Sequence, residues 1–168
     1  FAQQIPFRPN WAQEEIVREV ETALVEQRPC RIITLKARQL GVSTLAEAFV
    51  FLWALRHNTN SLVIADDKPN GETLFDKTKL YYETWPFREA YPVKYYRKNQ
   101  LTFERQGSNV WVMTAENPEA GRSRTVHCAH ASEVAFWSDP TATMTALNNS
   151  DPNLPGTLLI AESTANGV

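Results

Sequence analysis

A run of charged and small residues has the composition of a phosphate-binding loop. It follows a short β-branched segment, residues 31–35, and leads into an apolar helical pattern at residues 43–56. Backbone amides at the N-terminus of a helix carry partial positive charge and suit a phosphate group. The candidate loop consists of Lys36, Ala37, Arg38, Gln39, Leu40, Gly41, Val42, Ser43 and Thr44.

This loop departs from the usual frame G-x-x-x-x-G-K-S/T at two positions. Gly41 and Ser43 fit the frame. Lys36 replaces its first glycine, and Val42 replaces its lysine. The spacing is equally compatible with an ordinary strand-to-helix connection, in which Ser43 or Thr44 caps the helix.

The chemistry of a nucleotide site is nevertheless available in the loop. A lysine at its start, Lys36, could bend its ammonium back over the phosphates. The Ser43 hydroxyl could bind Mg²⁺, and Gly41 would let the backbone approach the phosphates. Arg38 could add a second cation for charge that develops on the γ-phosphoryl group. We therefore predict that ATP and Mg²⁺ bind at this loop.

A second candidate group is a carboxylate at the end of a later strand. Residues 125–131 have a strand pattern that leads to Ser132 and Glu133. ATP hydrolysis needs a carboxylate to polarise water, and the C-terminal end of a parallel strand beside the phosphate loop would hold it. We predict that Glu133 is this base and lies near the metal. A first-turn helix acid that suits the helix dipole is the alternative.

Three further segments carry candidate functional side chains. Gln13 could read the adenine edge through its amide, with Trp11 packed nearby. Arg122 or Arg124 could enter a neighbouring subunit's pocket and stabilise transition-state charge. Small side chains at the end of the last strand could sense the γ-phosphate: Ser163, Thr164, Ala165 and Asn166. Plainer roles are the alternatives, namely a solvated glutamine, surface arginines and a strand-ending turn.

The elements that must position these residues alternate between strand and helix patterns. Strands are predicted at residues 31–35, 61–65, 125–131 and 157–161, helices at residues 11–26 and 43–56 and after the turn at 66–69, and an antiparallel hairpin between residues 95 and 114. Apolar strands that alternate with helices favour a mostly parallel central sheet with helices on both faces. We therefore predict an α/β fold, with Phe136 and Trp137 in its core.

Composition limits the function further. The 168 residues suit a single domain, and a formal charge of −2 means that any contact with DNA must be local. No apolar run approaches the roughly 20 residues of a membrane span. Cys30 and Cys128 lack the spacing of a zinc site or a disulfide framework. His57, His127 and His130 are expected to be structural or without partners.

These motifs, in this order, resemble those of the N-terminal ATPase domain of viral (tailed-phage) large terminase subunits. Residues 33–44 look like the deviant Walker A motif of that family, with its lysine at the front of the loop. Residues 121–137 resemble its Walker B region, although Ser132 stands where an aspartate is usual, so that a contact to Mg²⁺ there would be neutral. Residues 160–167 resemble motif III, which couples hydrolysis to domain movement in that family. Residues 7–13 resemble its adenine-recognising segment.

The resemblance implies a P-loop NTPase of the RecA/ASCE type, with residues 1–168 forming a single ATPase domain and no C-terminal nuclease domain in this chain. It implies hydrolysis of ATP that drives double-stranded DNA into a capsid, and no nuclease activity. The implied partners are the portal protein, the small terminase subunit and further copies in a ring. The implied location is the host cell cytoplasm, at the procapsid portal, with no membrane.

Two alternatives remain open at this point. A helicase-like ATPase that remodels nucleic acid would share the glutamine segment, the phosphate loop and the acidic strand. A degenerate nucleotide-binding module would bind without turnover, because Ser132 replaces an acidic residue.

Overall fold

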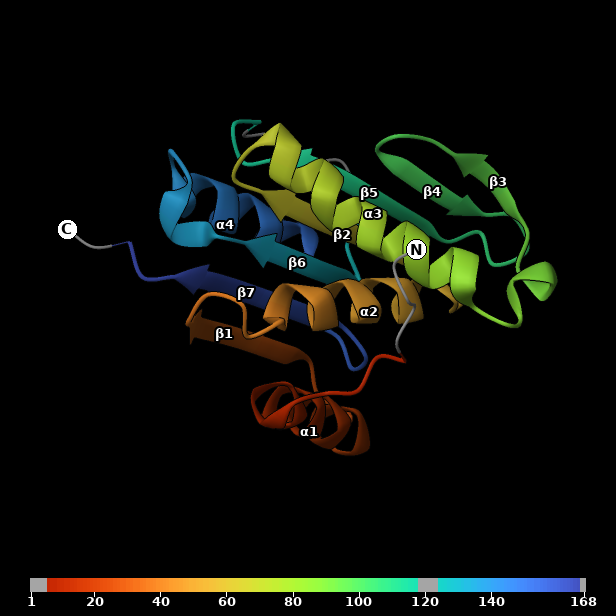
Figure 1. Cartoon of the computed structure of the whole chain (residues 1–168), viewed down its shortest axis with the longest axis horizontal. Helices are drawn as coiled ribbons and strands as arrows, with labels where there is room; N and C mark the ends of the chain where they lie inside the picture. The colour runs from red at the N-terminus through yellow and green to blue at the C-terminus, as the bar shows by residue number, and fades with distance from the viewer. Residues whose placement is uncertain (1–5, 118–123, 167–168) are drawn as a thin grey trace.

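In the computed structural model, residues 6–117 and 124–166 are described, and within them seven strands form one sheet. The strand order is β1-β7-β6-β2-β5-β4-β3, in which β1 to β5 of this order run parallel and β4 and β3 are antiparallel (Figure 1). The strands are β1 (Cys30–Lys36), β2 (Asn60–Ala65), β3 (Val93–Tyr96), β4 (Gln100–Phe103), β5 (Asn109–Thr114), β6 (Cys128–Ser132) and β7 (Leu158–Thr164). The predicted α/β fold with a mostly parallel sheet is confirmed.

Helices cover both faces of this sheet. They are α1 (Trp11–Val25), α2 (Val42–Ala54), α3 (Lys68–Thr84) and α4 (Pro140–Ser150), with short 3₁₀ helices η1 (Arg88–Ala90) and η2 (Val134–Phe136). Successive strand residues point to opposite faces. In β2, Val63 packs in the cluster of α1, α2 and α3, whereas Leu62 packs in the cluster that includes Leu147 of α4. None of the described helices is long and apolar enough to span a membrane.

Local capping residues determine where three of the helices begin. Asn10 and Gln13 form a capping box at the start of α1. Asp67 caps α3 and Asp139 caps α4, each by accepting a backbone hydrogen bond. Helix α2 differs, since it begins after Gly41 without a side-chain cap.

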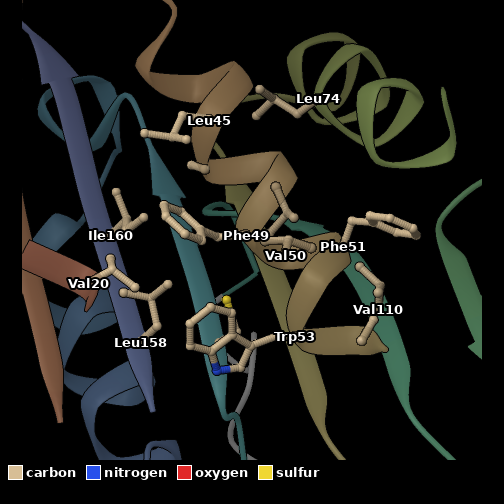
Figure 2. Close-up of a cluster of buried hydrophobic side chains, with 14 of the residues drawn as sticks. Val20, Leu45, Phe49, Val50, Phe51, Trp53, Leu74, Val110, Leu158 and Ile160 are labelled. Atoms are coloured by element: carbon tan, nitrogen blue, oxygen red, sulfur yellow. The ribbon is translucent and has the colours of Figure 1, made fainter. Parts of the chain in front are cut away.

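Helix α2 lies at the centre of the larger apolar cluster and packs against β2 and β6 (Figure 2). Its Phe49, Val50 and Trp53 are buried, as are Leu158 and Ile160 of β7. Because close packing on the sheet leaves little room for movement, the start of α2 is held at the carboxyl ends of the neighbouring strands.

Two element boundaries differ from the sequence-based prediction. The last strand was predicted to end at residue 161, but β7 continues to Thr164, paired in register with β1. The hairpin prediction is confirmed for β4 and β5, and β5 also pairs with β2, so it is an integral strand of the sheet. Pairing partners far away in the sequence extend and recruit these strands, and local periodicity does not record them.

Candidate nucleotide-binding site

A cleft of about 390 Å³ opens at the carboxyl ends of β1, β2, β6 and β7, beside the start of α2. We call it the phosphate-loop cleft. It is lined by Lys36, Arg38, Gln39, Ser43, Asp66, Asn70, Thr73, Leu74, Lys77, Ser132, Glu133, Phe136 and Thr164. The carboxyl ends of parallel strands are where α/β proteins bind their ligands.

The backbone of the loop is suited to an anion. Gly41 has φ of 72°, and a Cβ there would lie 2.7 Å from Nε2 of Gln13, so both conformation and space require glycine. Gln39 also has a positive φ, 64°, which is uncommon for a side-chain-bearing residue and often marks a functional loop. Ser43 and Thr44 lie inside α2, so the alternative in which one of them caps the helix is wrong. The first amides of α2 are left without a side-chain acceptor.

The displaced lysine has a structural reason. Val42, at the position of the usual lysine, is buried in the core, where an ammonium would lose its hydration. Lys36 instead ends β1 and directs its ammonium into the cleft. Its Nζ lies 2.8 Å from Oε2 of Glu162 and 3.2 Å from Oε1 of Glu133, and it donates to the Ser43 hydroxyl at 3.2 Å. Burial alone would lower the pKa of Lys36, but the two carboxylates raise it, so the ammonium stays charged.

Glu133 lies at the predicted place, directly after β6. Its φ is 53°, a left-handed conformation that costs energy for a residue with a side chain. Its Oε2 accepts hydrogen bonds from the backbone N–H and the hydroxyl of Thr164, both at 2.9 Å. Burial would raise the pKa of Glu133, but the bonds from Thr164 and the Lys36 ammonium lower it, so the group is an ionised carboxylate. A carboxylate in this state can accept a proton from water.

The end of β7 contacts the Glu133 segment directly. Besides Thr164, the Ser163 hydroxyl lies 3.5 Å from the Glu133 carboxylate and accepts a hydrogen bond from the backbone N–H of Ala135 at 3.2 Å. Asn166 donates to the carbonyl of Ala135 at 3.0 Å. The residues predicted to sense the γ-phosphate are thus joined to the predicted base, except for Ala165, which is exposed.

A buried charge network behind the cleft was not predicted. Glu162 is 1% exposed, and its Oε1 accepts hydrogen bonds from Ser43 and Ser132, both at 2.8 Å. His130 lies between it and a second buried carboxylate, with Nε2 3.3 Å from Glu162 and Nδ1 2.7 Å from Glu47. The expectation that His130 has no partner is therefore wrong. Glu47 in turn accepts a hydrogen bond from Thr78 of α3.

Charge pairing dominates the pKa values in this network. Burial would lower the pKa of His130, but the hydrogen bonds with Glu162 and Glu47 raise it to about 9. Burial would raise the pKa of Glu162, but His130 and Lys36 hold it at about 2. Both groups are therefore charged at neutral pH, which is how buried ionisable groups avoid the cost of standing alone. The sequence signal was a glutamate and a histidine at inward positions of apolar strands.

The adenine prediction concerns residues whose side chains have other contacts here. Gln13 is 3% exposed, accepts from the Asn10 backbone N–H at 2.8 Å and donates to the Gly41 carbonyl at 2.7 Å. It therefore links the start of α1 to the phosphate loop. Trp11 is 73% exposed. No contact bears on adenine itself, and the role of Gln13 stays a prediction.

The predicted arginines divide between the cleft and the rest of the chain. Arg38 is exposed and lines the phosphate-loop cleft. Arg124 stacks over the Trp111 ring at 4.0 Å and is not among the cleft residues of its own chain, so only a role in a neighbouring subunit remains predicted for it. Arg122 lies outside the described residues. Phe136, predicted in the core, lines the cleft instead, whereas Trp137 is buried as predicted.

These residues fit a nucleotide polyphosphate. An ammonium, helix amides and a hydroxyl meet in one cleft with an ionised carboxylate, which is the donor set that phosphates and a hard cation require. Within the described residues, no cluster of three or more His, Cys, Asp or Glu forms a metal cage, so a cation would be shared between the Ser43 hydroxyl, the ligand and water. The metal roles predicted for Ser43 and Glu133 remain predictions.

The class of protein follows from this architecture: a P-loop-like α/β domain in which β7 lies between the loop strand and the acidic strand. Solved structures with this fold are phage large terminases. The ATPase domain of the Thermus phage P74-26 large terminase matches with TM-score 0.66 and 21% identity, covering 96% of this chain and 67% of its own. The HK97 bacteriophage large terminase matches with TM-score 0.75 and 16% identity, covering 95% of this chain and 34% of its own.

A third similar structure is the large terminase of a thermophilic bacteriophage in complex with ADP. It matches with TM-score 0.63 and 14% identity, covering 91% of this chain and 38% of its own. No protein-family model and no curated protein matches the sequence. The chain therefore has the fold of phage large terminase ATPase domains, as its motifs predicted, and it spans about a third of the HK97 protein.

Proposed function

We propose that this chain is the ATP-hydrolysing motor domain of a phage large terminase, which powers translocation of double-stranded DNA into the capsid. The observation that carries the proposal is the convergence of Lys36, Ser43 and Glu133 in one cleft at the start of α2. Each supplies one requirement of phosphoryl transfer to water: positive charge, a metal ligand and a base.

In this mechanism, Lys36 exchanges its carboxylate partners for the phosphate oxygens, and the first amides of α2 donate to the same oxygens. The Ser43 hydroxyl offers a lone pair to Mg²⁺, which when bound supplies charge neutralisation between the phosphates. Glu133 then accepts a proton from the water that attacks the γ-phosphorus, while Arg38 at the cleft mouth stabilises the developing charge.

Motion follows from the contacts of Glu133 with the end of β7. Because Thr164 and Ser163 bond to the Glu133 carboxylate, a change in that carboxylate's partners during hydrolysis shifts the end of β7. The proposal includes self-association into a ring, with the portal protein and the small terminase subunit as partners, in the host cell cytoplasm. An arginine from a neighbouring copy, Arg122 or Arg124, completes each pocket.

Replacing the displaced lysine tests the proposal. Lys36→Ala is expected to weaken ATP binding about tenfold or more and to abolish phosphate release, because it removes a buried positive charge that faces the phosphates. Nucleotide titration and a phosphate-release assay measure these effects, with circular dichroism to confirm the fold. Lys98→Ala, which removes an exposed lysine outside the cleft, is the matched control. Unchanged affinity and turnover in Lys36→Ala would reduce Lys36 to a structural ion-pair partner.

One observation favours a second candidate function, a nucleotide-binding module without turnover. Ser132 replaces an acidic residue next to the predicted base. Phosphate release by the unaltered chain separates the two candidates: a motor domain releases phosphate, and the module binds ATP and does not.

A further inference from the structure

The carboxylate that P-loop enzymes use near their metal is missing from its usual strand. Their cation is held by the loop Ser/Thr together with an acidic residue that ends a neighbouring strand. Here that strand end is Ser132, whose hydroxyl carries no charge. A buried carboxylate on a different strand, Glu162 of β7, occupies the equivalent contact, since it accepts the hydrogen bond of Ser43 at 2.8 Å.

The register of the sheet explains the substitution. β7 lies between β1 and β6, and Glu162 is paired directly with Ser132 of β6 and with Thr34 of β1. Residues paired in this way point to the same face of a sheet. Glu162 therefore lies beside Ser132, which donates to its Oε1 at 2.8 Å, and within reach of the Ser43 hydroxyl from α2.

We propose that Glu162 is the metal-positioning carboxylate of this site, in place of the acidic residue absent at Ser132. This inference rests on the proposed nucleotide-binding function. Because Ser43 donates its proton to Glu162, the lone pairs of its oxygen are turned away from Glu162 and remain for other partners. One of them now accepts from Lys36, and it becomes free for a cation when Lys36 turns to the phosphates.

Charge balance supports the same assignment. The Glu162 carboxylate is fully buried, and Lys36 contacts it at 2.8 Å. If Lys36 turns to a phosphate, Glu162 keeps only His130, whose charge is shared with Glu47. A buried carboxylate that loses a cation is costly, and a divalent ion near Ser43 would replace that charge. Glu162 thus favours nucleotide binding with a cation over binding without one.

The test compares ADP affinity in Mg²⁺ and in EDTA, using isothermal titration of the 168-residue chain. Glu162→Gln keeps the shape of the side chain and removes its charge. We expect it to reduce the gain in ADP affinity on adding Mg²⁺ by roughly 10- to 100-fold, the usual effect of losing a group that orients a metal ligand. The affinity in EDTA is expected to stay equal or to rise, because a negative charge near the phosphates is removed.

Two further variants separate positioning from folding. Glu47→Gln removes the other carboxylate that contacts His130 but has no hydrogen bond with Ser43, so it should keep the Mg²⁺-dependent gain even if it lowers the melting temperature. Ser132→Asp, added to Glu162→Gln, returns the charge to the usual strand and should restore the gain.

The outcomes distinguish this inference from the proposed function. A Glu162→Gln chain that keeps the full Mg²⁺-dependent gain, or that loses affinity equally in Mg²⁺ and in EDTA, makes Glu162 a structural residue and overturns the inference alone. A gain lost equally in Glu47→Gln also overturns it. Failure of the unaltered chain to bind ADP under any condition overturns the proposed function and the inference together.

Discussion

The two sides of the sheet use their side chains in different ways. At the carboxyl ends of β1, β6 and β7, charged groups such as Lys36 and Glu162 are buried against one another. At the antiparallel edge, β4 contributes aromatic packing, with the Phe103 ring 6.5 Å from that of Phe51 and 5.6 Å from that of Tyr82. Both regions pack against α2 or α3.

Strand direction accounts for the difference. Neighbouring parallel strands end at the same edge, so one polar residue from each strand end is enough to build a charged cluster there. Antiparallel neighbours end at opposite edges, so the ends of β4 and β5 do not converge. The parallel half therefore supplies the chemistry, and the antiparallel edge supports α3, which lines the phosphate-loop cleft with Thr73 and Lys77. Three predictions test this division.

The largest effect is expected for the base in the parallel half. Glu133→Gln should lower the rate of phosphate release by about 10²- to 10⁴-fold and leave ATP bound, since the amide cannot accept a proton from water. Single-turnover phosphate release and nucleotide titration measure the two effects. Glu104→Gln changes an exposed glutamate near the antiparallel edge and serves as the control. Turnover at the parent rate in Glu133→Gln would indicate that another carboxylate, with Glu162 the nearest candidate, acts as the base.

A large effect on stability alone is expected at the antiparallel edge. Phe103→Ala should reduce the free energy of unfolding by about 3–5 kcal/mol, because it empties a fully buried ring position between Phe51 and Tyr82. Leu80→Ala, on the half-exposed side of α3, should change it by about 0.5 kcal/mol or less. Urea unfolding measures both. Nucleotide affinity of the folded Phe103→Ala chain should match that of the parent, and a large loss of affinity would break the division between the two regions.

The smallest effect concerns pH. The pKa of His130 in the folded chain, about 9, lies above its ordinary value of 6.5. Its stabilising contribution is therefore complete below pH 6.5 and is lost as the pH rises through about 9. Between pH 6 and pH 8 the unfolding free energy should fall by on the order of 2 kcal/mol in buffer without metal or nucleotide.

Urea titrations at the two pH values measure this slope. The window ends below the titration of Cys30 and Cys128, whose pKa values are raised by burial. His130→Gln should abolish the slope. A parent chain with equal stability at pH 6 and pH 8 would mean that the charges of Glu47 and Glu162 do not hold a proton on His130.

Much of the site was predictable from local sequence. The glycine, the hydroxyl and the lysine of the phosphate loop lie within residues 36–44, and a strand-to-helix transition of that length brings them together by backbone geometry alone. Capping residues and apolar periodicity likewise predict α1, α2 and β2, because these signals depend on neighbours only a few positions away. The end of the strand before Glu133 was predictable for the same reason.

Only the tertiary structure decided how the carboxylates are shared. Glu162 was predicted just outside a strand that ended at residue 161, whereas pairing with β1 and β6 extends β7 and buries that carboxylate between Ser43 and His130. Their separation along the chain, with Ser43 119 residues from Glu162, means that no local pattern records the contact. It depends on β7 lying between β1 and β6 in one register, and strand order and register are set by burial of the whole sheet between its helices.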